Sequence, residues 1–344
     1  MNIKEREKTL DSEVSSILEH KGLIVSHIEL IGRLMNILYS ELSKYDFNFE
    51  SIVGKSKIYN TEERMNFVKQ FYTRHNIKFN VDEIINDGTL GFIYPESGSI
   101  YSETQYENET GKFSKYSPDL GGYQGFVNDK NLINIHNTGY IYDSVILAHE
   151  ISHYRDQFKN SNQISDLFTE TLAFVESIIM AKETLKNEEY DYYIKKSFFA
   201  FYHLSAINRI IYDFIILYKK LGYISYDNYC LLYGKIEYND YLDKIERLFN
   251  QQFDIPNSAR YTIAGLLVPF MLNKYEEDNK YFDTIQELHD IINNSDINTI
   301  LGKIGLSNSE GSYVNKHNLN ILIINLNDFL NENLEKGVGI VKWK

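Results

Sequence analysis

The chain has 344 residues, of which 43% are hydrophobic and only 4 are proline, and this composition excludes a protein that is disordered throughout. Its formal net charge of −13 argues against a nucleic-acid partner, because phosphate binding needs a basic face. Cys230 is the single cysteine, so an intrachain disulfide is excluded, as is usual for proteins of a reducing compartment.

The most charged and the most apolar stretches agree with a cytoplasmic location. The first residues, 1–8, are too charged to lead the apolar core of a secretory signal. The most apolar stretch, 198–217, is interrupted by His203, Arg209 and Asp213, which makes a membrane span improbable. We therefore expect a cytoplasmic protein with no membrane partner, and a buried or half-buried helix over 198–217.

In chain order, helices come first. Residues 12–45 and 61–75 carry apolar side chains at three- and four-residue spacing, which predicts amphipathic helices. Between residues 88 and 125 Gly, Ser, Asn and Tyr dominate, which predicts strands and long loops. Beyond Glu176 nearly everything is expected to be helical. The predicted fold class is therefore mainly α with a small β-sheet. We expect an N-terminal helical lobe over 1–115 and a second lobe over 116–344 with the edge strand and the C-terminal helices, or one continuous domain that contains both.

A strand and a helix are expected to adjoin near the middle of the chain. Residues 132–135 are the best strand candidate, which we interpret as an edge to which an extended peptide could add its own backbone hydrogen bonds. After it, Asp143 or Ser144 is a candidate N-cap, followed by a bulky apolar run over 145–148. That run predicts a helix with one buried side.

This helix carries the segment that says most about function. His149 and His153 are at positions i and i+4, so both imidazoles lie on one face of the helix and can bind the same metal ion. Glu150 follows the first histidine and can accept a proton from an attacking water molecule. Two stray histidines on a surface helix would not need an apolar run directly before them, so the context favours a metal site.

A catalytic zinc ion takes three protein ligands, and the third is expected on the next helix. Residues 166–179 form an apolar helical pattern, on which Glu170, Ala173 and Ser177 share one stripe with Asp166. We predict Glu170 as the ligand, because the small Ala173 one turn on leaves room for the first helix. Asp166 is predicted to contact one of the metal ligands rather than the metal ion itself. Glu176 is the alternative, although it lies well round the helix from Glu170.

These motifs resemble those of a known family, the oligoendopeptidase F and thimet oligopeptidase group of zinc metallopeptidases. The likeness rests on His-Glu-x-x-His and on Phe-Thr-Glu-Thr-Leu-Ala-Phe-Val-Glu after it. Weaker matches follow the family's order: a glycine turn over 120–125, the strand leading into the zinc helix, a tyrosine-bearing helix over 261–267 and a closing helical segment over 295–305.

The resemblance implies a zincin-like core in which two helical lobes flank a cleft, and an activity that hydrolyses short peptides with one Zn²⁺ ion. By the same resemblance, Tyr261 would donate a hydrogen bond to the oxyanion. The glycine turn and the strand would contribute the residues expected to contact substrate, Gly121, Gly122, Asn134 and His136.

The chain departs from the family in several places. The interval between His153 and Glu170 is short, Ser177 stands where the family usually has a second Glu, and the His and Tyr residues expected before Tyr261 are absent. These gaps keep one alternative open, a zinc-containing peptide-binding or regulatory protein with impaired catalysis. A di-iron carboxylate bundle would need a second Glu-x-x-His, which the sequence lacks.

Overall fold

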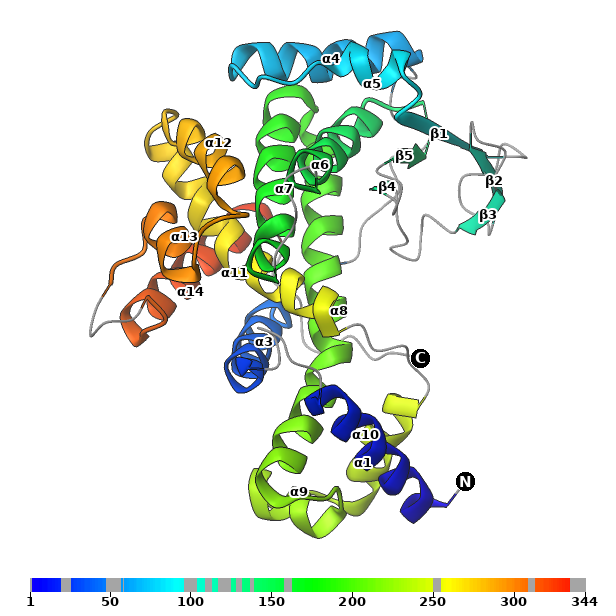
Figure 1. Ribbon diagram of the computed structural model, residues 1–344, viewed down its shortest axis with the longest axis vertical. Coiled ribbons are helices and arrows are strands. Elements are labelled where there is room, and N and C mark those ends of the chain that lie inside the picture. Colours follow the sequence, from blue (N-terminus) through cyan, green and yellow to red (C-terminus); the bar gives the residue numbers. More distant parts are fainter. Residues whose placement is uncertain are drawn as a thin grey trace. The chain divides into compact units, whose positions relative to one another are not determined.

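The chain, in a computed structural model, is mainly helical with a small sheet, as the sequence predicts (Figure 1). The structure describes residues 2–19, 26–47, 57, 59–95, 104–108, 113–116, 125–127, 132–136, 139–157, 163–249, 255–308 and 313–334. The strands are β1 (Leu90–Pro95), β2 (Thr104–Asn108), β3 (Phe113–Tyr116), β4 (Gly125–Val127) and β5 (Ile133–His136). The helices are α1 (Ile3–Glu19), α3 (Ile28–Leu42), α4 (Thr61–Arg74), α5 (Val81–Asn86), α6 (Tyr142–Gln157), α7 (Gln163–Thr184), α8 (Asn187–Leu221), α9 (Tyr226–Tyr233), α10 (Tyr238–Phe249), α11 (Ile255–Glu277), α12 (Tyr281–Ile291), α13 (Ile297–Ile304) and α14 (Lys316–Asn333).

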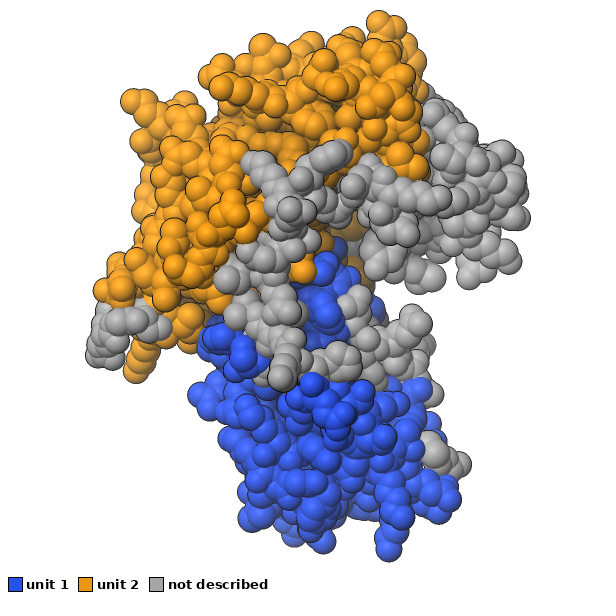
Figure 2. All heavy atoms as spheres, in the orientation of Figure 1, with its two compact units in different colours: residues 1–43, 201–263 blue, residues 44–200, 264–344 orange. Residues whose placement is uncertain are grey.

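The chain divides into two compact units (Figure 2). Unit 1 consists of residues 1–43 and 201–263, and unit 2 of residues 44–200 and 264–344. This division differs from the boundary between residues 115 and 116 that the sequence suggests. The physical reason is that α8 and α11 each run from one unit into the other, so each unit is assembled from two separate stretches of chain.

Unit 1 is a helical bundle. Helices α1 and α10 pack on one another, and Leu10 and Val14 of α1 are buried. Tyr241 of α10 is fully buried, and its hydroxyl donates a hydrogen bond of 2.7 Å to the Glu7 carboxylate. Helix α1 begins at Ile3, earlier than the periodicity from residue 12 indicates, because the first turns are charged and carry little pattern.

Unit 2 contains the sheet, whose strand order is β3-β2-β1-β5-β4. Strands β1 and β5 run parallel, and β4 pairs antiparallel with β5. The expectation that residues 132–135 form an edge strand is therefore wrong: β5 lies between β1 and β4, and β4 occupies that end of the sheet. The error has a simple cause, since strand pairing joins segments far apart in sequence and no local pattern specifies it.

Helix α6 follows β5 along the chain and packs against β4, β5, α4 and α7. It begins at Tyr142, so neither Asp143 nor Ser144 is the N-cap that the sequence suggests. Instead, the Asp143 carboxylate forms an ion pair with the buried Arg64 of α4 and accepts a hydrogen bond from the Gly139 amide at 3.1 Å. Ser144 donates to the Arg64 carbonyl at 2.9 Å. These contacts fix the start of α6 against α4.

Candidate metal centre

Two packed helices of unit 2 carry the site. In α6, Val145, Ala148 and Ile151 are completely buried, which anchors the face next to the histidines. In α7, Ala173 is completely buried, as expected for a small residue where two helices approach closely. The predicted close approach of the two helices is confirmed, and it brings their polar side chains together in an otherwise apolar interior.

Three ligand-type atoms converge on one point. His149 Nε2 and His153 Nε2 lie 3.1 Å apart. Glu170 Oε2 lies 3.6 Å from His149 Nε2 and 3.6 Å from His153 Nε2. Within the described residues these side chains form the group of His, Cys, Asp and Glu whose ligand atoms are close enough to hold a metal ion. The prediction that Glu170 stands with the two histidines is confirmed.

The spacing of these atoms fits a small tetrahedral ion. With metal–ligand distances of about 2.1 Å, the ligand atoms of a tetrahedral zinc site are separated by roughly 3.4 Å. The separations here are 3.1, 3.6 and 3.6 Å. Two imidazoles and one carboxylate are also a donor set that suits zinc, although other divalent ions accept it.

The carboxylate is the strongest sign that a cation belongs there. Glu170 is 8% exposed, and no donor among the described residues reaches its Oε2 atom within hydrogen-bond distance. A buried carboxylate oxygen without a hydrogen bond is costly in free energy, and the two imidazole nitrogens, at 3.6 Å, are too far away to donate one. A cation placed between the carboxylate and the two imidazoles would remove that cost, so the residues present fit a metal ion.

The charges of the group reinforce one another. Burial lowers the pKa of His153, but the Glu170 carboxylate outweighs this effect and raises that pKa to about 9. Burial would raise the pKa of Glu170, but the His153 and His149 imidazoles hold it far below its ordinary value. Glu170 is therefore ionised throughout the neutral range, and its negative charge favours any positive charge between the imidazoles.

Glu150 lies in the same buried surroundings. It is 6% exposed, and burial raises its pKa, while the His149 and His153 imidazoles act in the opposite direction. A carboxylate with a raised pKa takes up a proton more readily at neutral pH than an exposed one. Glu150 therefore has the surroundings of a proton acceptor.

Glu176 is not a ligand of this group, in agreement with the choice of Glu170. It is completely buried on another side of α7, where both of its oxygens accept hydrogen bonds from Arg155 Nη1, at 2.9 and 3.1 Å. Gln286 Nε2 donates to the same carboxylate at 2.6 Å. His289 Nε2 lies 3.1 Å from it.

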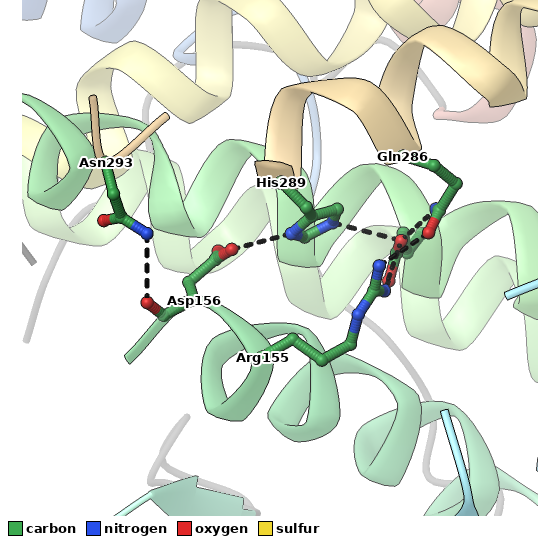
Figure 3. A network of polar contacts seen from close by, with 6 residues as sticks. Arg155, Asp156, Gln286, His289 and Asn293 are labelled. Atoms are coloured by element: carbon green, nitrogen blue, oxygen red, sulfur yellow. Dashed lines mark hydrogen bonds and ion pairs between the residues drawn. The ribbon is translucent and has the colours of Figure 1, made fainter. Parts of the chain in front are cut away.

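These contacts belong to a buried polar network that joins the end of α6 to α7 and α12 (Figure 3). His289 Nδ1 lies 2.7 Å from Asp156 Oδ1, Arg155 Nη2 donates to Gln286 Oε1 at 2.6 Å, and Asn293 Nδ2 donates to the Asp156 carbonyl at 3.3 Å. The sequence does not predict this network. Its one local signal is an arginine and an aspartate directly after the motif, and nothing local connects them to α12.

A pair of hydroxyl groups next to His149 Nδ1 is a second feature that the sequence does not predict. Ser177 Oγ is 3.5 Å from His149 Nδ1, and the Tyr193 hydroxyl donates to Ser177 Oγ at 2.7 Å. Ser177 shares the helical stripe of Glu170, which is the signal that places it here. Asp166, the residue expected in this supporting role, is half-buried, whereas the Ser177 hydroxyl lies within hydrogen-bond distance of a ligand-type imidazole.

The residues predicted to bind substrate lie in different surroundings, and two of them are outside the described residues. Asn134 of β5 is 2% exposed, and its side chain lies over Gly91 of β1, so it is buried on a face of the sheet. His136 ends β5, and the structure describes its backbone but not its side chain. Gly121 and Gly122 lie outside the described residues.

Tyr261, the predicted oxyanion donor, lies on α11 as expected and is half-buried. Its ring meets that of Phe201 edge-on at 5.9 Å between centroids. Both residues belong to unit 1, whereas the three ligand-type residues belong to unit 2. The role of Tyr261 therefore stays a prediction.

Comparison with known proteins adds no relatives: no family model, no curated protein and no solved structure matches the chain. In the part of the chain that the structure describes, every helix is too short or too polar to cross a membrane. The functional argument therefore depends on the geometry of the site itself.

Proposed function

We propose that the chain is a zinc-dependent peptidase that hydrolyses short peptides. The observation that carries the proposal is the convergence of His149 Nε2, His153 Nε2 and the buried Glu170 Oε2, with Glu150 buried beside them. A zinc ion held by these residues supplies a Lewis acid that polarises a peptide carbonyl and makes water more acidic. The remaining steps fall to side chains of the chain.

Glu150 serves as the general base in this proposal. Its position in the sequence, directly after His149, turns it away from the ligand atoms but keeps it beside them. It accepts the proton of the attacking water and passes it to the leaving amine. The raised pKa of its buried carboxyl supports this role, because a group that returns a proton to an amine must hold it in between.

The Glu170 carboxylate has a separate role. It neutralises one positive charge of the ion and, together with His149 and His153, holds the ion in place. Because the three side chains come from two helices packed on one another and are at most 14% exposed, the proposed site is organised before an ion binds. The zincin-like core and the lobes flanking a cleft belong to the same proposal.

Two measurements on purified protein test it. Elemental analysis is expected to find one zinc ion per chain. A library of quenched fluorescent peptides is expected to be cleaved, with the activity lost on chelation and restored by zinc. Stoichiometric zinc without cleavage of any peptide would contradict the peptidase and favour the alternative, a zinc-containing peptide-binding or regulatory protein.

A further inference from the structure

Two hydroxyl groups stand behind one of the ligand-type histidines. Ser177 of α7 and Tyr193 of α8 are 0% and 3% exposed, so bulk water does not compete for their hydrogen bonds. The Tyr193 hydroxyl donates to Ser177 Oγ at 2.7 Å, and Ser177 Oγ donates to the Phe174 carbonyl at 3.2 Å. The same Oγ atom lies 3.5 Å from His149 Nδ1, at the long end of hydrogen-bond distance.

The protons available on Ser177 and Tyr193 indicate which atom donates in the contact between Ser177 Oγ and His149 Nδ1. A serine hydroxyl has one proton and two lone pairs. The proton of Ser177 goes to the Phe174 carbonyl, and one lone pair receives the Tyr193 proton. In this arrangement the remaining lone pair of Ser177 Oγ accepts, and the proton of the contact is carried by His149 Nδ1. In a neutral imidazole the other nitrogen, Nε2, then bears its lone pair.

That nitrogen is the one that faces the other ligand-type atoms, 3.1 Å from His153 Nε2 and 3.6 Å from Glu170 Oε2. We propose that Tyr193 and Ser177 are positioning residues that fix His149 in the tautomer with its proton on Nδ1 and so present the Nε2 lone pair to a metal ion. The inference deepens the proposed function and rests on it for the identity of the ion.

An uncharged hydrogen-bonding partner for His149 suits position 177, because buried carboxyl groups already lie nearby. Glu150 and Glu170 are two buried carboxyl groups close enough to Tyr193 to influence its pKa, which burial raises above the ordinary value. A carboxylate at position 177 would add a third negative charge to this region, at a high desolvation cost. Two hydroxyl groups orient the imidazole without that charge, and the phenol of Tyr193 stays protonated as a donor.

The test compares Ser177→Ala and Tyr193→Phe with the unaltered full-length chain, by two measurements. One is the tautomer of His149 in metal-free protein, from long-range proton–nitrogen NMR correlations of protein labelled with ¹⁵N at histidine. The other is zinc affinity, from competition with a chromophoric chelator. Loss of such supporting contacts typically weakens metal binding by about 10- to 100-fold.

We expect Ser177→Ala to fall in that range and to reduce the fraction of His149 protonated at Nδ1. Tyr193→Phe leaves Ser177 in place and is expected to have a smaller effect in the same direction. Ser177→Thr keeps a hydroxyl at this position and is expected to bind zinc almost as tightly as the unaltered chain.

Matched controls exist in unit 1. Ser205 is a buried helical serine that donates to a carbonyl three residues back, at 2.9 Å, and Tyr212 is a completely buried tyrosine whose hydroxyl donates to the Ile255 carbonyl at 3.4 Å. Ser205→Ala and Tyr212→Phe remove the same atoms and are expected to leave zinc affinity unchanged.

Unaltered zinc affinity and an unaltered His149 tautomer in Ser177→Ala would overturn the inference. A folded chain that binds zinc but cleaves no peptide would contradict the proposed function. The present inference would still be tested by comparing the zinc affinities of the variants with that of the unaltered chain. If the unaltered chain fails to bind zinc, the tautomer measurement still decides it, since it needs no metal.

Discussion

His289 Nδ1 lies 2.7 Å from Asp156 Oδ1, and each side chain is 2% exposed. Asp156 follows His153 by less than one turn of α6, whereas His289 belongs to α12, so this contact ties α6 to a part of unit 2 that is distant in sequence (Figure 3). On its other side His289 meets Glu176 of α7. One imidazole thus connects the two helices that carry the ligand-type residues.

This arrangement predicts a stability that depends on pH. Burial lowers the pKa of His289, but Asp156 and Glu176 outweigh it and raise that pKa above the ordinary value of 6.5. A raised folded-state pKa contributes stability that is complete below the unfolded value and disappears as the pH rises through the folded value. The difference in unfolding free energy between the unaltered chain and His289→Gln should therefore shrink as the pH rises above the ordinary value of 6.5.

The measurement is urea unfolding of both proteins with zinc removed. His153 also titrates in this range, but it is present in both proteins and cancels in the difference. A difference that stays constant or grows with pH would show that the charged form of His289 does not stabilise the fold.

Breaking the Arg155–Glu176 pair should destabilise the fold strongly. Arg155→Met would leave the completely buried Glu176 carboxylate without its main counter-charge. Removing one partner of a buried pair typically costs about 3–5 kcal/mol. The exposed pair of Arg74 and Glu183 offers a matched control, for which Arg74→Met should cost less than about 1 kcal/mol. Equal losses in urea unfolding would contradict this ranking.

Glu150→Gln separates catalysis from metal binding. The substitution keeps the size of the side chain but removes its capacity to accept a proton, so peptide hydrolysis should fall by about 100- to 10,000-fold. Zinc content should stay at one ion per chain, because Glu150 is not among the ligand-type residues. A variant that keeps most of its activity would rule out Glu150 as the base.

Glu170→Gln should weaken zinc binding far more than Asp166→Asn does. The two acids lie one turn apart on α7, but only the carboxylate of Glu170 faces both imidazoles, at 3.6 Å from each. Isothermal titration of each metal-free variant with zinc would measure the ranking. Comparable losses in the two variants would mean that Asp166 supports the site as strongly as Glu170.

The candidate site is predictable from sequence because its geometry is local. Spacing of i and i+4 puts His149 and His153 on one face of any helix, and the same periodicity selects Glu170 over Glu176. The supporting groups are not predictable, since Tyr193 and His289 reach the site from other helices. The sheet shows the same limit: the pattern places β5 to within one residue, but it does not specify the pairing with both β1 and β4. Contacts between distant segments leave no trace in a local pattern.

The two long helices that cross between the units have a practical consequence. Residues 44–200 end inside α8, and residues 264–344 begin inside α11. A fragment cut at either place would expose a severed helix with an apolar face, including the completely buried Phe198 and Ala264 near the cuts. Dissection of this protein therefore calls for point substitutions in the intact chain rather than truncation.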